Sequence, residues 1–474
     1  MTTLLDDPVA TPPPDPPLDL SIPHRLHVVG VGGPGMSALA IALAEMGHHV
    51  SGSDLRDHPV LDRLRAAGVD THVGHDRTLV HGVDAVTGSS AIPSTNIELD
   101  EARRTGVAVL SRAGMLASIC ARARSLAVAG THGKTTTTSM LMLIMAGAGL
   151  RPSFIVGGDV ADLGTGAQWT GRDWLVVEAD ESDGTHLELP LFGTILTNVE
   201  IDHLDHFGTF DEVIASFDRY LGQIAGPKVV CADDEIAAEL GRRHNATSYG
   251  LSPAADIRAV DVHATGGSFS FAIERKGTRI GTVELPLRGL HNVVNATGAL
   301  AMALEVGVDI DDAAGALARF GGVARRFDIR GVDRGATFVD DYAHLPSEIA
   351  AVLDAARHSG DDWSRVIAVF QPNRFNRISE MWAEYRDAFS TADLVVLTDI
   401  YPSGTAPIPG VTGKLIVNAV AETHPGQRLV WLPRRDDLVA FVAGEARAGD
   451  VVISMGCGDI ASFPEEVIDA RRTR

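Results

Sequence analysis

Short apolar runs that alternate with longer helix-like patterns are the feature that most limits how this chain of 474 residues can fold. Such alternation is typical of parallel sheets whose faces are covered by helices. It recurs in three segments, and the chain is longer than one hydrophobic core usually supports. We therefore expect three successive α/β domains with mainly parallel sheets, at residues 24–123, 124–326 and 327–474, after a disordered tail at residues 1–23.

The composition indicates a soluble globular protein. Apolar residues make up 45% of the chain, yet no unbroken apolar run reaches the length of a membrane span. The formal net charge of −22 argues against general binding to nucleic acid or to anionic membranes, because both need a basic surface. The Pro- and Asp-rich start lacks the basic and apolar regions of a secretory signal. We expect a cytoplasmic protein, monomeric or homodimeric, without stable membrane association.

A glycine-bracketed Lys-Thr pair lies between a strand-like run and a helix-like run at residues 127–138. Glycines let backbone N–H groups approach phosphate oxygens, and the helix N-terminus contributes its positive dipole end. Lys134 would add a point charge and Thr135 a hydroxyl for Mg²⁺. The segment predicts an ATP site in a P-loop-type central domain, formed by Gly130, Thr131, His132, Gly133, Lys134, Thr135 and Thr136.

The segment matches only the shorter form of the phosphate-loop pattern, Gly-Thr-x-Gly-Lys-Thr. The longer pattern fails because Val128 stands where it requires a glycine. The alternative is a glycine-rich turn that only caps a helix. Lysine usage favours the phosphate site, since the chain has four lysines against 36 arginines and one of the four lies in this loop.

The first strand-like run, residues 26–29, is followed by a second glycine-rich loop. Gly30, Gly32 and Gly35 match the pattern G-x-G-x-x-G, and Asp54 lies about 20 residues further on, after another strand-like run at 49–53. The pattern is typical of a loop that binds a pyrophosphate at a helix N-terminus, with an acidic side chain near a ribose. A Rossmann-like domain that binds NAD or a UDP-sugar would satisfy it equally, and a tight turn without ligand is the alternative.

Polar clusters follow two strand-like runs of the central domain. Residues 178–183, Glu-Ala-Asp-Glu-Ser-Asp, follow the run 174–177, and a second cluster containing Asn198, Asp202, His203 and Asp205 follows the run 194–197. Ligands of open parallel sheets bind at the carboxyl ends of strands. Oxygen and imidazole donors there, beside a phosphate loop, are what a Mg²⁺–ATP site needs. Solvated acidic loops are the alternative.

The third segment, expected to be Rossmann-like, carries two further polar motifs at residues 340–344 and 371–377. Arg374 and Arg377 are three residues apart just after a strand-like run. On one helical turn both guanidinium groups could converge on a carboxylate. A pair of surface arginines is an equal alternative from the residues alone.

Taken together and in this order, these motifs resemble the Mur ligases of peptidoglycan synthesis, over nearly the whole chain after the tail. The resemblance is carried by residues 32–37, 51–54, 89–92, 130–135, 178–183, 202–205, 291–292, 295–296, 325–328, 340–342, 401–402 and 407–411. It implies a UDP-substrate domain, a central ATPase domain and a mobile C-terminal domain.

The resemblance also implies site residues. The UDP-sugar would be held by Gly32, Gly33, Gly35, Met36, Ser37, Asp54, Ser89 and Ser90. ATP would be held by the loop 130–136 together with Asn292, Asn295, Arg326 and Asp341. Two Mg²⁺ ions would be held by Thr135, Glu178 and His203. The amino acid would be held by Tyr342, His344, Arg374 and Arg377.

The activity implied is the ATP-dependent joining of L-alanine to the lactyl carboxylate of UDP-N-acetylmuramate through an acyl phosphate. The catalytic residues would be Lys134, Glu178, His203, Arg326 and His344. Several relatives use a carbamylated lysine beside the metals, but no lysine lies between Lys134 and Lys228, as in the alanine-adding branch. The chain departs from that branch at Asn373 and Leu345, where histidines are frequent.

Two other activities stay open. A recycling ligase that attaches a whole tripeptide to the same UDP-sugar shares the motifs of the first two domains. An NAD-dependent oxidoreductase would explain the first glycine loop but leaves the phosphate loop and the acidic clusters without a role.

Overall fold

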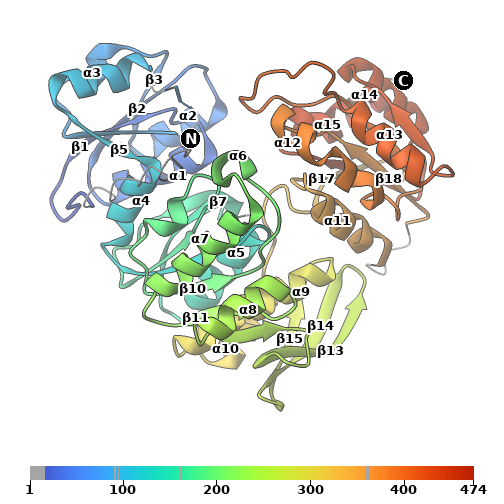
Figure 1. Ribbon diagram of the computed structural model, residues 1–474, viewed down its shortest axis with the longest axis horizontal. Coiled ribbons are helices and arrows are strands. Elements are labelled where there is room, and N and C mark those ends of the chain that lie inside the picture. The colour runs from blue at the N-terminus through green and yellow to red at the C-terminus, as the bar shows by residue number, and fades with distance from the viewer. Residues whose placement is uncertain (1–16, 90–91, 94, 161–162, 359–362, 474) are drawn as a thin grey trace, which may run out of the picture.

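The computed structural model describes residues 17–89, 92–93, 95–160, 163–358 and 363–473. It contains three sheets, mainly parallel and each packed between helices, in three successive bodies (Figure 1). The expected three-domain α/β architecture is confirmed.

The first sheet has five strands, all parallel, in the order β3-β2-β1-β4-β5. Its strands are β1 (Arg25–Val29), β2 (His49–Asp54), β3 (Asp70–Val73), β4 (Ala85–Gly88) and β5 (Ala108–Ser111). Its helices are α1 (Pro34–Glu45), α2 (Pro59–Ala66), α3 (Ile97–Thr105) and α4 (Arg112–Cys120). The first glycine loop joins β1 to α1, as the dinucleotide pattern predicts.

The central sheet has ten strands in the order β15-β14-β13-β12-β11-β10-β6-β9-β7-β8. Its strands are β6 (Arg124–Ala129), β7 (Ser153–Val160), β8 (Thr165–Gln168), β9 (Trp174–Glu178), β10 (Gly193–Leu196), β11 (Lys228–Cys231), β12 (Thr247–Gly250), β13 (Ile257–Thr265), β14 (Ser268–Arg275) and β15 (Thr278–Leu285). The pairs β7–β8, β13–β14 and β14–β15 are antiparallel and lie at the two edges. The helices are α5 (Lys134–Gly147), α6 (Leu204–Phe207), α7 (Phe210–Gln223), α8 (Glu235–Arg243), α9 (Leu290–Glu305) and α10 (Ile310–Leu317).

Strand β6 lies between β10 and β9, so the loops after all three strands meet at one edge of the central sheet. These loops hold the phosphate loop and the two polar clusters. The sheet order therefore brings together three motifs that are far apart in the sequence.

The third sheet has six strands in the order β16-β17-β21-β18-β19-β20, and only β16–β17 is antiparallel. Its strands are β16 (Asp328–Asp333), β17 (Ala336–Asp341), β18 (Arg365–Phe370), β19 (Leu394–Leu397), β20 (Leu429–Trp431) and β21 (Asp450–Met455). Its helices are α11 (Pro346–His358), α12 (Phe375–Met381), α13 (Lys414–Thr423), α14 (Arg435–Glu445) and α15 (Phe463–Arg472).

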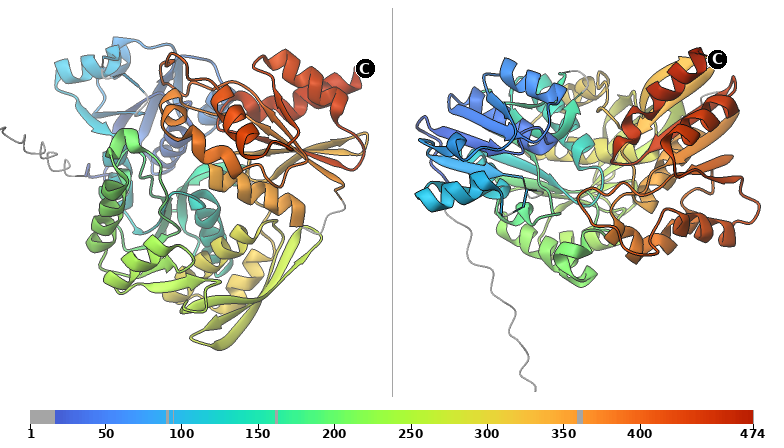
Figure 2. Two further views of the ribbon diagram at one scale, coloured as in Figure 1. Left: turned by 45° about the vertical axis from the view of Figure 1, so that its right-hand side comes forward. Right: turned by 90° about the horizontal axis from the view of Figure 1, so that it is seen from above.

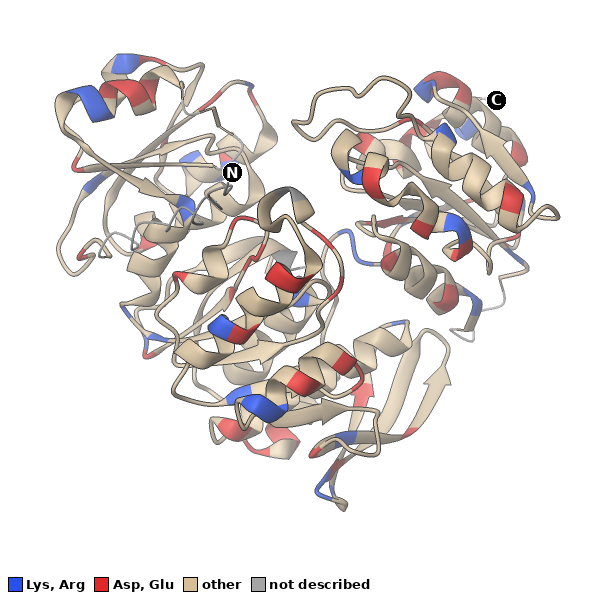
Figure 3. Cartoon of the chain, in the orientation of Figure 1, with Lys and Arg blue, Asp and Glu red and all other residues tan. Residues whose placement is uncertain are grey.

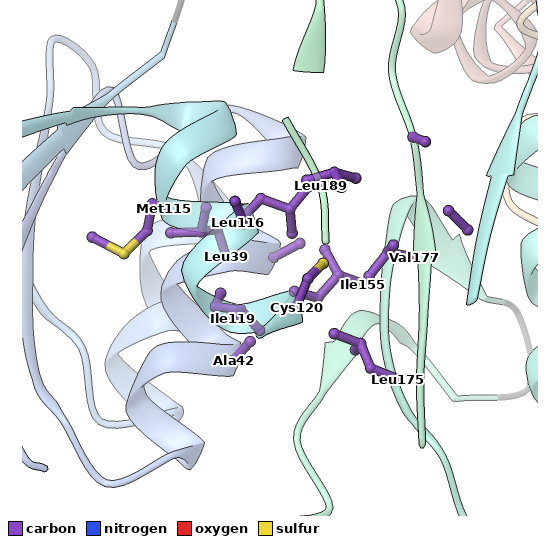
Figure 4. Close-up of a cluster of buried hydrophobic side chains, with 14 of the residues drawn as sticks. Leu39, Ala42, Met115, Leu116, Ile119, Cys120, Ile155, Leu175, Val177 and Leu189 are labelled. Carbon is purple, nitrogen blue, oxygen red and sulfur yellow. The ribbon is translucent and has the colours of Figure 1, made fainter. Parts of the chain in front are cut away.

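The first and central domains share one hydrophobic core. Leu39 of α1 and Leu116 and Ile119 of α4 belong to the same buried cluster as Ile155 and Leu189 of the central domain (Figure 4). The third domain has its own clusters on the two faces of its sheet. It stands beside the other two in all three views (Figures 1 and 2).

The sequence predicts a disordered tail at residues 1–23, but the structure describes part of it, from residue 17 on. Residues 1–16 lie outside the described residues, but Leu20 is buried and the Leu18 N–H donates to Ser118 Oγ at 2.9 Å. These contacts hold Leu18 and Leu20 against the first domain. Within the described ranges, no helix is both long and apolar enough to cross a membrane. Acidic and basic positions are interspersed over all three domains (Figure 3).

Candidate active site

A cavity of about 1010 Å³, which we call the main cavity, lies where the three domains meet. Fourteen of the predicted site residues line it, and they come from all three domains. They are Gly35, Ser37, Thr131, His132, Gly133, Lys134, Thr135, Glu178, His203, Arg326, Tyr342, His344, Arg374 and Arg377. The sequence motifs thus converge on one space.

The other residues predicted for the UDP-sugar support the first glycine loop. Asp54 Oδ2 accepts the N–H of Gly32 at 2.9 Å, and a Cβ on Gly32 would collide with that carboxylate. Met36 is buried in the core beneath the loop, and the Ser89 N–H donates to Val29 O. Gly33 is likewise part of the turn, and Ser90 lies outside the described residues.

Two glycines give the ATP loop its shape. Gly130 has φ +126° and Gly133 has φ +79°, conformations that other residues rarely adopt. A Cβ at Gly130 would collide with Thr197 Oγ1, and one at Gly133 would lie 2.6 Å from Asn295 Oδ1. The loop is therefore pressed against β10 on one side and α9 on the other, and Thr136 is buried behind it.

Asn198 fastens the ATP loop from behind. Its Oδ1 accepts the His132 N–H at 2.8 Å and its Nδ2 donates to His132 O at 3.1 Å. Sequence reasoning placed Asn198 in the polar cluster expected for Mg²⁺–ATP, and its role as a support of the loop was missed. The available signal is its position just after β10, the strand that lies next to β6 and its phosphate loop.

Lys134 lies among oxygen atoms. Its ammonium donates to Gly130 O at 2.6 Å and to both oxygens of Glu181, at 2.9 and 2.8 Å. Burial alone would lower the pKa of Lys134, but Glu181 and Asp180 outweigh burial and raise it, so the amine stays charged. A phosphate entering the loop would compete with Glu181 for this cation.

The donors predicted for Mg²⁺ fit a metal that also binds phosphate. The Thr135 hydroxyl donates to Glu178 Oε1 at 2.8 Å, so both oxygens can face one ion. Nδ1 of His203 is buried and has no hydrogen-bond partner, and burial lowers the pKa of this ring to about 4, leaving it neutral. In the described part of the chain, no three His, Cys, Asp or Glu side chains gather as a complete metal site. Mg²⁺ commonly takes few protein ligands and completes its shell with phosphate oxygens and water.

The residues predicted for adenine and ribose make separate local hydrogen bonds. Asn295 Nδ2 donates to Asn292 Oδ1 at 3.3 Å on α9. Both oxygens of Asp341 accept backbone N–H groups, from Phe327 and Ala343, each at 2.7 Å. Asp341 therefore holds Phe327, at the start of the third domain, and Ala343 beside the end of β17. Its contact with ribose stays a prediction.

The arginine pair is not arranged as predicted. Helix α12 begins at Phe375, and Arg374 precedes it with φ +61°, so the two arginines do not share a helical turn. Arg377 is buried and donates to Asp202 Oδ1 at 2.9 Å and to Asn373 Oδ1 at 2.7 Å. Asp202 belongs to the central domain, so this ion pair joins two domains across the cavity wall.

Glu348 of α11 links the ATP loop to the residues predicted for the amino acid. It accepts from His132 Nδ1 at 3.1 Å and from the N–H groups of His344 and Leu345 at 2.9 and 3.1 Å. His344 and His132 outweigh burial and hold the pKa of Glu348 well below its usual value. Sequence reasoning missed Glu348. Its place near the start of a helix, where a glutamate can cap the preceding N–H groups, is the available signal.

Comparison with known families agrees with this geometry. Three family models match: "Mur ligase family, catalytic domain" at residues 25–124, "Mur ligase middle domain" at 128–303 and "Mur ligase, glutamate ligase domain" at 325–458. Together they span most of the chain, in the order in which the three sheets follow one another.

Individual relatives and solved structures agree as well. The chain is 42% identical over 448 residues to a UDP-N-acetylmuramate–L-alanine ligase of Rubrobacter xylanophilus, covering 94% of this chain and 99% of the relative. A relative of the same name from Acidothermus cellulolyticus is 42% identical over 466 residues, 97% of each chain. The crystal structure of UDP-N-acetylmuramate-alanine ligase MurC from Thermotoga maritima superposes with a TM-score of 0.81 at 26% identity, over 95% of this chain and 99% of that one. The chain belongs to the Mur ligase family.

Proposed function

We propose that this protein joins L-alanine to the lactyl carboxylate of UDP-N-acetylmuramate, using ATP and releasing ADP and phosphate in the cytoplasm. The observation that carries the proposal is the main cavity, where a phosphate loop, a pyrophosphate-type loop and a buried arginine meet. The names of the relatives, which share about 40% of the sequence over nearly its full length, support the same substrates.

In the first step a carboxylate oxygen forms a bond to the γ-phosphorus of ATP, and the bond from that phosphorus to the β–γ bridging oxygen breaks. ADP leaves and an acyl phosphate remains. Lys134 and Arg326 would offset the repulsion between the two anions, since fixed cations in a buried site stabilise developing charge. Thr135, Glu178 and His203 would hold Mg²⁺, with two ions expected, and the metal would screen the phosphate charges.

In the second step the neutral amine of alanine attacks the acyl carbon. The C–N bond forms, the C–O bond to phosphate breaks, and phosphate leaves while the nitrogen loses a proton. Arg377 and Arg374 would bind the alanine carboxylate, and Tyr342 and His344 would line the amine's approach. No side chain need become covalently bound, because orientation and exclusion of water supply the rate enhancement.

The other assignments belong to the same proposal. Gly32, Gly33, Gly35, Met36, Ser37, Asp54, Ser89 and Ser90 would hold the UDP part, and Asn292, Asn295 and Asp341 would hold the adenosine. The proposal also includes the domain limits 24–123, 124–326 and 327–474. It further includes a monomer or homodimer that stably binds neither nucleic acid nor membrane.

The test is an omission assay for ADP release with ATP, Mg²⁺, UDP-N-acetylmuramate and L-alanine. We expect release only when all four are present, with a product heavier by one alanyl residue. Replacing alanine with the tripeptide L-Ala-γ-D-Glu-meso-diaminopimelate distinguishes the recycling activity, because a recycling ligase would turn over with the tripeptide alone. Turnover with neither amine would refute the proposal.

A further inference from the structure

Arg112, the first residue of α4, lines the main cavity from the side of the first domain. Its helix is firmly placed, since Met115, Leu116 and Ile119 are buried in the core that the first and central domains share (Figure 4). The side chain is 19% exposed, so it is mostly enclosed but still open to the cavity.

The guanidinium of Arg112 is clamped on one side by the acidic segment after β9. Nη2 donates to Asp180 Oδ2 at 3.0 Å and to Asp183 Oδ2 at 2.9 Å, and Nε donates to Asp183 Oδ2 at 3.2 Å. Thr185 Oγ1 accepts a further bond from Nη2 at 3.2 Å. These contacts fix the plane of the guanidinium and leave Nη1 on the opposite side.

Nη1 is turned toward the first glycine loop. A Cβ on Gly35 would lie 3.7 Å from it, and both Gly35 and Arg112 line the main cavity. The loop itself, residues 30–37, contains no charged side chain. A pyrophosphate on this loop would carry two negative charges with no cation from the loop to meet them. Arginine suits such a position, because its planar fork can hold a carboxylate on one edge and a phosphate on another.

We propose that Arg112 is a substrate-binding residue that donates Nη1 to the pyrophosphate of the UDP-sugar, with Asp180 and Asp183 holding the guanidinium in place. The inference rests on the proposed function and adds to it a cation for the nucleoside diphosphate. It also ties the pyrophosphate to the segment that contains Glu181, the partner of Lys134.

The test is calorimetric binding of UDP and of uridine to the full-length protein, with a non-hydrolysable ATP analogue and Mg²⁺ saturating the ATP loop. Arg112→Gln should weaken UDP binding about 10- to 100-fold, as expected for the loss of a hydrogen bond to a charged group, and should leave uridine binding within about two-fold. Arg112→Lys should recover part of the UDP affinity. Asp183→Asn is the matched control, because it removes one clamp but keeps the cation, and it should weaken UDP binding by less than about three-fold.

Equal losses of UDP and uridine affinity in Arg112→Gln, matched by Asp183→Asn, would overturn the inference and leave Arg112 as a tie between domains. Unchanged UDP affinity in a folded Arg112→Gln protein would overturn it as well. The proposed function is judged separately on the wild-type protein. A wild type without ligase activity whose UDP affinity still depends on Arg112 would sink that function while supporting the phosphate contact.

Discussion

The two ends of the main cavity are built differently. At the ATP end, Gly130, Gly133 and Asn198 all belong to the central domain, and backbone groups make most of the contacts. At the amine end, Arg377 and Glu348 come from the third domain and meet Asp202 and His132 of the central domain. The glycines, Lys134 and Asn198 of the phosphate loop are therefore supported within one domain, with His132 as the loop's link to Glu348 of the third domain. The contacts of Arg377 and Glu348 at the amine end exist only while two domains touch.

This difference bears on which of the two substrate sites forms first. Since most supports of the phosphate loop lie in the central domain, we expect the loop to bind ATP without the amine end being formed. An amine site that needs the contact can form as water is excluded from the acyl phosphate. The following substitutions separate the two ends.

The largest effect is expected at Lys134. Lys134→Ala removes the buried cation at the phosphates and should lower ADP release by about a thousand-fold or more, in line with the loss of a main electrostatic contact in a buried site. Lys228→Ala, on β11, is the matched control and should keep near-normal turnover. Normal turnover in Lys134→Ala would refute the assignment of the ATP loop.

The next effect is expected at Arg377. Arg377→Met should raise the KM for alanine about a hundred-fold, because a buried charged contact to the carboxylate is lost. ATP binding should change little, since the ATP end does not depend on this residue. A loss of ATP affinity as large as the loss for alanine would show that the two ends are not separate.

Gly130→Ala tests the backbone of the ATP end. The substitution should cost about 1–3 kcal/mol of stability and weaken ATP binding, because the residue has φ +126° and Thr197 occupies the space for a Cβ. Gly149→Ala is the control, because Gly149 also has positive φ, at +79°, but has open space around it. It should cost about 1 kcal/mol and leave ATP binding intact, as thermal unfolding and ATP titration of both variants would show.

The smallest expected effect is the pH dependence of the contact between His132 of the central domain and Glu348 of the third domain. Burial would lower the pKa of His132, but Glu348 and Glu200 outweigh it and raise the value to about 9. The raised pKa means that the contact is fully stabilised below the ordinary value of 6.5 and loses this stabilisation as pH rises through about 9. Fluorescence energy transfer between labels on the central and third domains should report a modest opening over that range. His132→Gln should flatten the response, and an unchanged response in that variant would assign it to another group.

The same contrast explains what could be predicted from sequence. The phosphate loop is a run of consecutive residues, so its glycines, Lys134 and Thr135 could be picked out from the sequence, and the structure places them together beside one cavity. The contact between His132 and Glu348 joins residues 216 positions apart, and the pair Asp202–Arg377 spans 175 positions. Such pairs depend on how two domains meet, which periodicity and spacing do not encode.

The fold shows a similar division. Alternating runs predict three parallel α/β domains correctly, because each strand and helix is a local pattern. The ten-stranded order with β6 between β10 and β9 is a tertiary result. The left-handed backbone of Arg374 was also missed, since a non-glycine residue with positive φ leaves no mark in the sequence.

The most direct test of the proposed chemistry is oxygen transfer from the substrate carboxylate. UDP-N-acetylmuramate labelled with ¹⁸O in its lactyl carboxylate would be converted with ATP and L-alanine, and the phosphate and nucleotide products weighed by mass spectrometry. Formation of an acyl phosphate predicts one ¹⁸O atom in inorganic phosphate and none in ADP. Unlabelled phosphate, or label in AMP, would contradict the account.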